Sequence, residues 1–136
     1  MEKLFQQKKL FVALFWIWGI IVFILSSIPN IPTQKLNIWD EPFRLDYLEH
    51  FGVFAILGAF FVVWKSDMSC KLDRKKYLFP FLGIILFAVL DETHQLWVDG
   101  RTFNPLDMFY NILGLLAAYY LGPFILAWFC KKSVSS

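Results

Sequence analysis

Long apolar segments separated by short polar ones run along this 136-residue chain. About 20 helical residues cross the hydrocarbon core of a bilayer, so the pattern predicts transmembrane helices over residues 10–28, 46–64, 77–98 and 105–128. The first apolar run is too long for a signal-peptide core, and no small-residue cleavage site follows it. The predicted fold is an all-α membrane protein, a single domain over residues 1–136 built as a bundle of four transmembrane helices.

The connectors between these helices differ in character. Residues 29–45 contain three prolines and are predicted to form an irregular loop on the membrane interface. Residues 65–76 are polar and basic. Residues 99–104 are so few that the third and fourth helices are predicted to be antiparallel neighbours.

Lysine and arginine are divided unevenly between the two ends of the predicted bundle. Ten lie in the N-terminal segment, the second connector and the C-terminal segment, whereas three lie in the first and third connectors. Because basic residues concentrate in cytoplasmic loops, both termini are predicted to be cytoplasmic. Cys70 and Cys130 then lie on the reducing side, so no disulfide is expected.

Composition supports the membrane assignment and narrows the range of partners. Hydrophobic residues make up 58% of the chain, and the mean hydropathy is +0.55. A soluble domain of this length would keep a far more polar surface. The net charge of +2 gives no reason to expect an acidic polymer. Membrane lipid is therefore a predicted partner and nucleic acid is not.

Ionisable and amide side chains interrupt the apolar segments near one end of the predicted bundle. Each ionisable group costs on the order of 3 kcal/mol inside a membrane helix, so such groups usually face a protein interior or a wet cavity. Three helices and the third connector present these groups at a similar depth. The residues are Asp46, His50, Asp91, Glu92, Gln95, Arg101, Asp107 and Asn111. We predict that they form a polar pocket facing the extracytoplasmic side.

The helical period predicts which polar residues of the third helix share a face. Asp91 and Gln95 share one face, and Glu92 and His94 flank it on opposite sides. The two flanking residues cannot both point to the centre of the bundle. Asp91, Gln95 and Glu92 are predicted to face the pocket, whereas ordinary packing is the better explanation for His94.

The fourth helix carries a single stripe formed by Asp107, Asn111, Gly114 and Ala118. Residues at this spacing lie on one side of a helix. The small members of the stripe are predicted to let another helix approach closely beneath the polar pair.

Purely structural roles also fit several of these residues. Asp46 and Glu49 have the spacing of a capping box at the start of the second helix. His50 stands one turn after Asp46 and fits a packed histidine bonded to that carboxylate. Both interpretations compete with a place in the pocket.

The start of the fourth helix has similar alternatives. Asn104 and Pro105 fit an N-cap followed by proline at the first helical position. Asp107 would then sit in the first turn, where a carboxylate stabilises the helix dipole. Arg101 fits a surface cation that neutralises Asp99 or Asp107.

Two blocks of sequence resemble the VanZ-like family of bacterial membrane proteins. The first, DYLEHF, starts at Asp46. The second follows the pattern D-E-x-x-Q…R…D-x-x-x-N-x-x-G from Asp91 to Gly114. Tyr47 departs from the family, which often has lysine after the first aspartate. The resemblance covers residues 46–122.

The resemblance implies a small integral membrane protein of the teicoplanin-resistance type, acting in glycopeptide or lipoglycopeptide resistance. It implies no particular reaction. The functional set that it implies consists of Asp46, His50, Asp91, Glu92, Gln95, Arg101, Asp107 and Asn111.

The first functional hypothesis is binding or modification of an envelope component, such as a lipid-linked cell-wall precursor or the lipoglycopeptide itself. Carboxylates suit amines and sugar hydroxyls, and Arg101 suits a phosphate. An ion-coupled carrier is a further hypothesis, because buried carboxylates are typical of carriers. Four short helices give little room for alternating access, which disfavours it.

The remaining hypothesis is a membrane-embedded hydrolase or transferase that acts on a lipid-linked head group. His50 oriented by Asp46 would act as base or nucleophile. In a second version, a divalent cation held by His50, Asp91, Glu92 and Asp107 would activate water. These ligand types do not select between Mg²⁺, Mn²⁺ and Zn²⁺.

Overall fold

The computed structural model describes residues 2–29, 35–38, 41–67 and 71–134. Its main elements are helices α1 (Glu2–Ser26), α2 (Asp46–Lys65), α3 (Arg74–His94) and α4 (Pro105–Val134), with a short 3₁₀-helix, η1 (Gln95–Trp97), after α3. Cys70 and the side chain of Cys130 lie outside the described residues, so the expected absence of a disulfide stays a prediction.

The described residues contain four helices long and apolar enough to span a membrane, as predicted. Their apolar spans are Lys8–Ser26, Asp46–Lys65, Arg74–Trp97 and Pro105–Ala127. The bounds differ from the predicted ones: α1 begins at Glu2 and ends at Ser26, α3 runs from Arg74 to His94, and α4 continues to Val134, whereas α2 differs by one residue at its end. Lysine and glutamine in the flanks of α1 and α4 are good helix formers, so the helices continue past their apolar segments.

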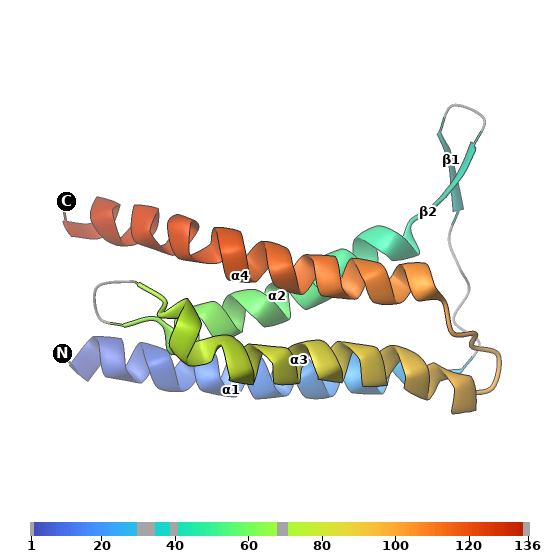
Figure 1. Ribbon diagram of the computed structural model, residues 1–136, viewed down its shortest axis with the longest axis horizontal. Helices are drawn as coiled ribbons and strands as arrows, with labels where there is room; N and C mark the ends of the chain where they lie inside the picture. The colour runs from blue at the N-terminus through green and yellow to red at the C-terminus, as the bar shows by residue number, and fades with distance from the viewer. Residues whose placement is uncertain (1, 30–34, 39–40, 68–70, 135–136) are drawn as a thin grey trace.

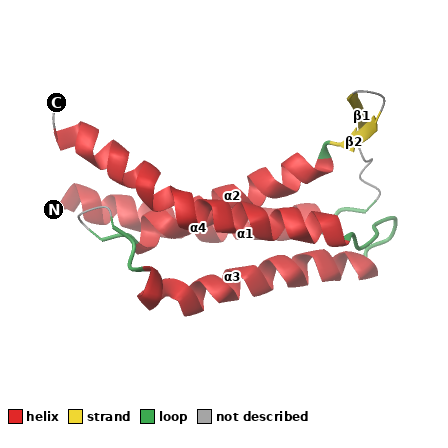
Figure 2. Cartoon of the chain, turned by 45° about the horizontal axis from the view of Figure 1, so that its top comes forward, coloured by secondary structure: helices red, strands yellow, loops and turns green. Residues whose placement is uncertain are grey.

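The helices lie lengthwise, with the chain termini at one end of the bundle (Figure 1). The α3–α4 loop and a small β-hairpin lie at the opposite end, and α2 crosses α4 obliquely (Figure 2). The N-terminal ends of α2 and α4 and the C-terminal ends of α1 and α3 therefore meet at the loop end. This is the end where the sequence predicts the polar pocket.

The first connector is not irregular throughout, so that prediction was wrong in part. Strands β1 (Lys35–Ile38) and β2 (Glu41–Arg44) pair antiparallel, with Asn37 opposite Pro42. Both strands of a two-stranded ribbon are edge strands, where a proline without an N–H is tolerated. Residues 30–34 and 39–40 of the same connector lie outside the described residues.

Helices α2 and α4 form the most extensive helix–helix contact of the fold. A Cβ atom placed on Gly58 would lie 2.7 Å from Cβ of Ala118, and one on Gly114 would overlap the carbonyl oxygen of Phe51. The backbones therefore touch at these positions. The predicted role of the small residues on the α4 stripe, Gly114 and Ala118, is confirmed.

Aromatic side chains fill the middle of the bundle and join α3 to this pair. The Phe81 ring stacks on Tyr119 of α4 with centroids 4.0 Å apart. Phe61 of α2 also contacts Phe81, with ring centroids 6.1 Å apart. The Tyr119 hydroxyl donates to the carbonyl oxygen of Arg74 at 2.7 Å. These contacts fix the N-terminal half of α3.

Helix α1 is held against α2 by a hydrogen bond as well as by packing. The indole N–H of Trp18 donates to the carbonyl oxygen of Val53 at 2.9 Å. Inside a bilayer such a bond satisfies a donor that would otherwise lie in hydrocarbon. It fixes the position of α1 about two turns from the end of the bundle that holds the polar residues.

Gly114→Ala should weaken the contact between α2 and α4, because the added methyl group has no space beside Phe51. We expect the free energy of unfolding to fall by about 1–3 kcal/mol, the usual effect of overpacking. Titration with SDS in mixed micelles would measure it.

Gly52→Ala is the matched control, since a Cβ atom there meets nothing within 4 Å. Alanine in an open helical position should stabilise by about 0.5–1 kcal/mol relative to glycine. Equal effects of the two substitutions would contradict the close approach at Gly114.

Candidate functional site

A cavity of about 220 Å³ lies at the loop end of the bundle. Helices α1, α2 and α3, with η1 and the α3–α4 loop, contribute its walls. Its apolar side is formed by residues such as Val22 and Phe54. Its polar lining consists of Ser26, Glu49, His50, Asp91, Gln95 and Arg101. The predicted convergence of polar side chains at one end is therefore present.

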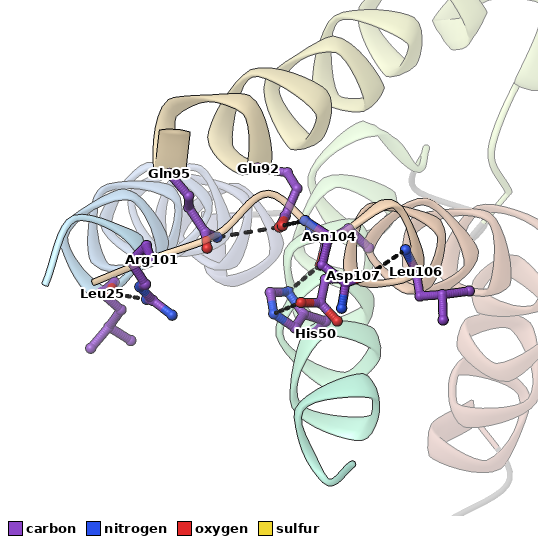
Figure 3. Close-up of polar contacts among 9 residues, drawn as sticks. Leu25, His50, Glu92, Gln95, Arg101, Asn104, Leu106 and Asp107 are labelled. Atoms are coloured by element: carbon purple, nitrogen blue, oxygen red, sulfur yellow. Dashed lines mark hydrogen bonds and ion pairs between the residues drawn. The ribbon is translucent and has the colours of Figure 1, made fainter. Parts of the chain in front are cut away.

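His50 is oriented by α4. Its Nδ1 lies 2.9 Å from Oδ1 of Asn111. Its Nε2 lies 3.7 Å from Oδ2 of Asp107, and the close-up shows these two side chains next to each other (Figure 3). Because an amide oxygen can only accept, Nδ1 is the donor of the hydrogen bond with Asn111. The partners of the two ring nitrogens thus come from α4, whereas the sequence suggested Asp46 of α2 as the partner.

Asp91 is buried, with 3% of its surface exposed, and faces α1. The Ser26 hydroxyl donates to Oδ1 of Asp91 at 2.6 Å. Gln95, one turn further along, lines the same cavity. The face predicted for Asp91 and Gln95 therefore does point into the pocket.

Glu92 has different hydrogen-bond partners from the adjacent Asp91. It is fully buried, and its two carboxyl oxygens accept hydrogen bonds from the Asn104 backbone N–H at 3.1 Å and the Gln95 amide at 3.2 Å. The Asn104 side chain in turn accepts from the Leu106 N–H at 3.0 Å, which confirms it as the cap before Pro105. Glu92 thus ties the α3–α4 loop to α3 (Figure 3), and it is not among the residues that line the cavity.

Arg101 connects that loop to α1. Its Nη2 donates to the carbonyl oxygen of Leu25 at 3.0 Å, whereas the sequence had offered Asp99 or Asp107 as partners. The guanidinium also lines the cavity. Its Nε is buried without a hydrogen-bond partner in the described part of the chain, so the group still has donor capacity.

The remaining polar residues of α2 and α3 are placed as follows. Leu45 is the N-cap of α2, so Asp46 is the first residue of the helix and not its cap. Asp46 is half-buried in the first turn, and exposed Glu49 lines the cavity. The ring of His94 packs against Phe23 with centroids 5.0 Å apart, outside the cavity lining.

Comparison with known proteins identifies the family. Residues 10–127 of the chain match the VanZ/LLP1 family. The chain belongs to the VanZ/LLP1 family. No curated protein and no solved structure shows significant similarity to it. The resemblance seen in the blocks that start at Asp46 and Asp91 is confirmed and extends over α1, so the protein is a multi-pass membrane protein of this family.

The four metal ligands that the sequence suggested for this VanZ/LLP1 protein do not fit the observed geometry. Among the described residues, no group of three or more His, Cys, Asp or Glu side chains lies close enough to hold a metal ion. Glu92 faces Asn104 and does not line the cavity, whereas Asp91 faces Ser26 on the side of α1. His50, Asp91, Glu92 and Asp107 therefore do not form one coordination sphere.

Sequence reasoning missed two polar residues that line the cavity of this VanZ/LLP1 protein: Glu49, which was interpreted as part of a capping box, and Ser26. Ser26 is the less expected of the two. It lies in the last turn of α1, an apolar helix in which one hydroxyl barely alters the hydropathy. It is buried nonetheless, with 7% of its surface exposed. The signal that was available is the pair Ser26-Ser27 at the end of an apolar run, because serine in membrane helices often bonds across to another helix.

Ser26→Ala should destabilise the protein, because Asp91 loses its partner inside the bundle. We expect a decrease of about 1–3 kcal/mol in the free energy of unfolding, the usual effect of a buried polar group left without its hydrogen bond. The same SDS titration would measure it.

Ser27→Ala is the matched control. Both serine hydroxyls lie within hydrogen-bond distance of the Phe23 carbonyl oxygen, but only Ser26 reaches Asp91. The control should stay within about 0.5 kcal/mol of the wild type. If Ser26→Ala left the free energy of unfolding unchanged, the hydrogen bond between Ser26 of α1 and Asp91 of α3 would not stabilise the protein.

Proposed function

We propose that this VanZ/LLP1 protein binds the polar head group of a lipid-linked envelope component on the extracytoplasmic side, and thereby contributes to resistance to teicoplanin-type lipoglycopeptides. The observation that supports this most is the cavity of about 220 Å³ with carboxyl groups and a guanidinium in one lining. Carboxylates accept hydrogen bonds from amines and hydroxyls, and a guanidinium donates to phosphate. Head groups of envelope lipids carry these groups.

Binding is better supported than catalysis by the arrangement of the polar groups. Both ring nitrogens of His50 face side chains of α4, so the ring is held in place by Asn111 and Asp107. A general base must instead reach the proton that it removes, within about 2.6–3.2 Å. The described side chains also supply no metal-binding cluster that would activate water. We therefore favour a binding protein over a hydrolase or transferase.

The proposed orientation places both termini in the cytoplasm. It is supported by the distribution of basic residues, of which ten lie toward the terminal end and three toward the loop end. The cavity then faces the side of the membrane where the cell wall is assembled and where lipoglycopeptides meet their target.

Cysteine labelling should confirm this orientation. In a background with Cys70→Ser and Cys130→Ser, the exposed residues Asp99 and Lys71 mark the loop end and the terminal end. We expect a membrane-impermeant maleimide to label Asp99→Cys in intact cells. Lys71→Cys should react only after the cells are made permeable. The reverse pattern would place the cavity on the cytoplasmic side.

Teicoplanin susceptibility tests the binding function. Expression of the protein in a susceptible bacterium should raise the minimal inhibitory concentration. His50→Ala and Asp91→Asn should return it to the value of cells without the protein, because the first removes the imidazole from the cavity lining and the second replaces a carboxyl group by an uncharged amide. Asp91→Asn keeps the size of the side chain, so it separates binding chemistry from folding.

His94→Ala is the control, since His94 is at the same end of the bundle but packs against Phe23 outside the cavity lining. Its susceptibility should equal that of the wild type. Immunoblots of membranes would show whether the variants reach the same level. Full resistance in an abundant Asp91→Asn variant would contradict the proposed function.

A further inference from the structure

An apolar crevice lies beside the polar cavity, on the same three helices. Its volume is about 510 Å³, within the range of about 300–1,000 Å³ typical of small-molecule sites. Aromatic and aliphatic side chains line it, with Lys65 as the only charged member of the lining. Its walls include Ile20 and Phe23 of α1, Leu57 and Phe61 of α2, and Ile84 and Phe87 of α3.

The crevice and the polar cavity follow the same helix faces. On α2, the residues run from His50 and Phe54 at the cavity to Leu57 and Phe61 at the crevice, and this spacing keeps them on one side of the helix. On α3, Phe87 stands one turn below Asp91. The two sites therefore lie one above the other.

Two phenylalanines mark the junction between them. Phe54 lines the polar cavity, Phe87 lines the crevice, and their ring centroids are 6.3 Å apart. On α1, Phe23 of the crevice is one turn from Ser26 of the cavity. The lining therefore changes from polar to apolar across this junction.

Glycines hollow the crevice on two of its walls. A Cβ atom on Gly83 would meet nothing within 4 Å, and one on Gly19 would meet only Cδ1 of Leu57, at 3.9 Å. From Phe15 to Phe23 the crevice extends along α1 for about 12 Å at the helical rise per residue. It is therefore an elongated space that protein atoms do not fill.

The crevice is open to the surrounding lipid along α1. Trp16, Ile20 and Phe23 line it and are also exposed on the outside of the bundle. A chain that enters from the bilayer gains no hydrophobic free energy, because lipid tails are as apolar as the crevice. Selection must therefore come from the polar cavity, and the crevice determines only which attached chain fits.

We propose that one lipid occupies both sites, with its hydrocarbon chain in the crevice and with a head group carrying a phosphate and an amine in the polar cavity. This inference rests on the proposed head-group binding. Arg101 suits the phosphate, and the carboxyl groups of Glu49 and Asp91 suit the amine. The crevice thus makes the ligand a membrane lipid and not a free head group.

Photo-crosslinking in vesicles tests this directly. The purified full-length protein is reconstituted in phosphatidylcholine vesicles with a trace of phosphatidylethanolamine that carries a diazirine in one acyl chain. Mass spectrometry of the adducts should find them on α3 around Ile84 and Phe87. A probe with the same chain but a glycerol head group, which lacks the amine, should give about tenfold fewer crevice adducts.

The variants separate the two parts of the ligand. Gly83→Leu fills the crevice and should remove the crevice adducts. Asp91→Asn should lower them about tenfold, the effect of replacing a charged hydrogen-bond acceptor for the amine by an uncharged one. Gly52 is another position where a Cβ atom meets nothing within 4 Å, but it lies outside both linings. Gly52→Leu should therefore leave the amount of crevice adducts unchanged. Adducts on exposed Leu86 report bulk lipid and should stay constant in all variants.

Crevice adducts that are equal for both head groups, or unchanged in Asp91→Asn, would show that bulk lipid fills the crevice independently of the cavity. That result, or the absence of crevice adducts in the wild type, overturns the inference. Neither result determines the outcome of the susceptibility experiment with Asp91→Asn, which tests head-group binding alone. Failure of the inference and failure of the proposed function are therefore distinguishable.

Discussion

The arrangement of the whole pocket depends on the close approach of α2 and α4. Gly114 allows the backbone of α4 to touch that of α2 at Phe51, and Gly58 packs against Ala118 in the same way. Helices in a bilayer gain little from burying apolar surface against each other, so close packing of small residues contributes much of their association. This contact brings Asn111 to within 2.9 Å of His50 and fixes the histidine ring.

The other two helices are attached differently, and the difference explains the crevice. At the loop end, α1 is tied to its neighbours by hydrogen bonds, from Ser26 to Asp91 and from Arg101 to the Leu25 carbonyl. Below these ties, Gly19 and Gly83 bring no side chain to fill the space between α1 and α3. Polar ties at one end and missing side chains lower down leave an apolar space directly beneath a polar cavity.

Sequence reasoning located the spans, the polar end of the bundle and the shared faces, because hydropathy and the helical period are local properties. Asp91 and Gln95 line the cavity as their spacing indicated. The partner of His50 was beyond its reach, since periodicity says which residues share a face but not which helix that face meets. Ser26 was hidden for another reason, because one hydroxyl hardly changes the hydropathy of an apolar helix.

The adjacent carboxyl groups of Asp91 and Glu92 show how one short motif serves two purposes. Glu92 accepts hydrogen bonds from Asn104 and Gln95 with both oxygens, so its bonding is directed at the protein itself. Asp91 has one oxygen bonded to Ser26 and stands in the cavity wall. A 100° turn between successive helical residues is enough to separate them, because it points one side chain at the loop and the other at the cavity. The pair can therefore hold the α3–α4 loop in place and still present a carboxyl group to a ligand.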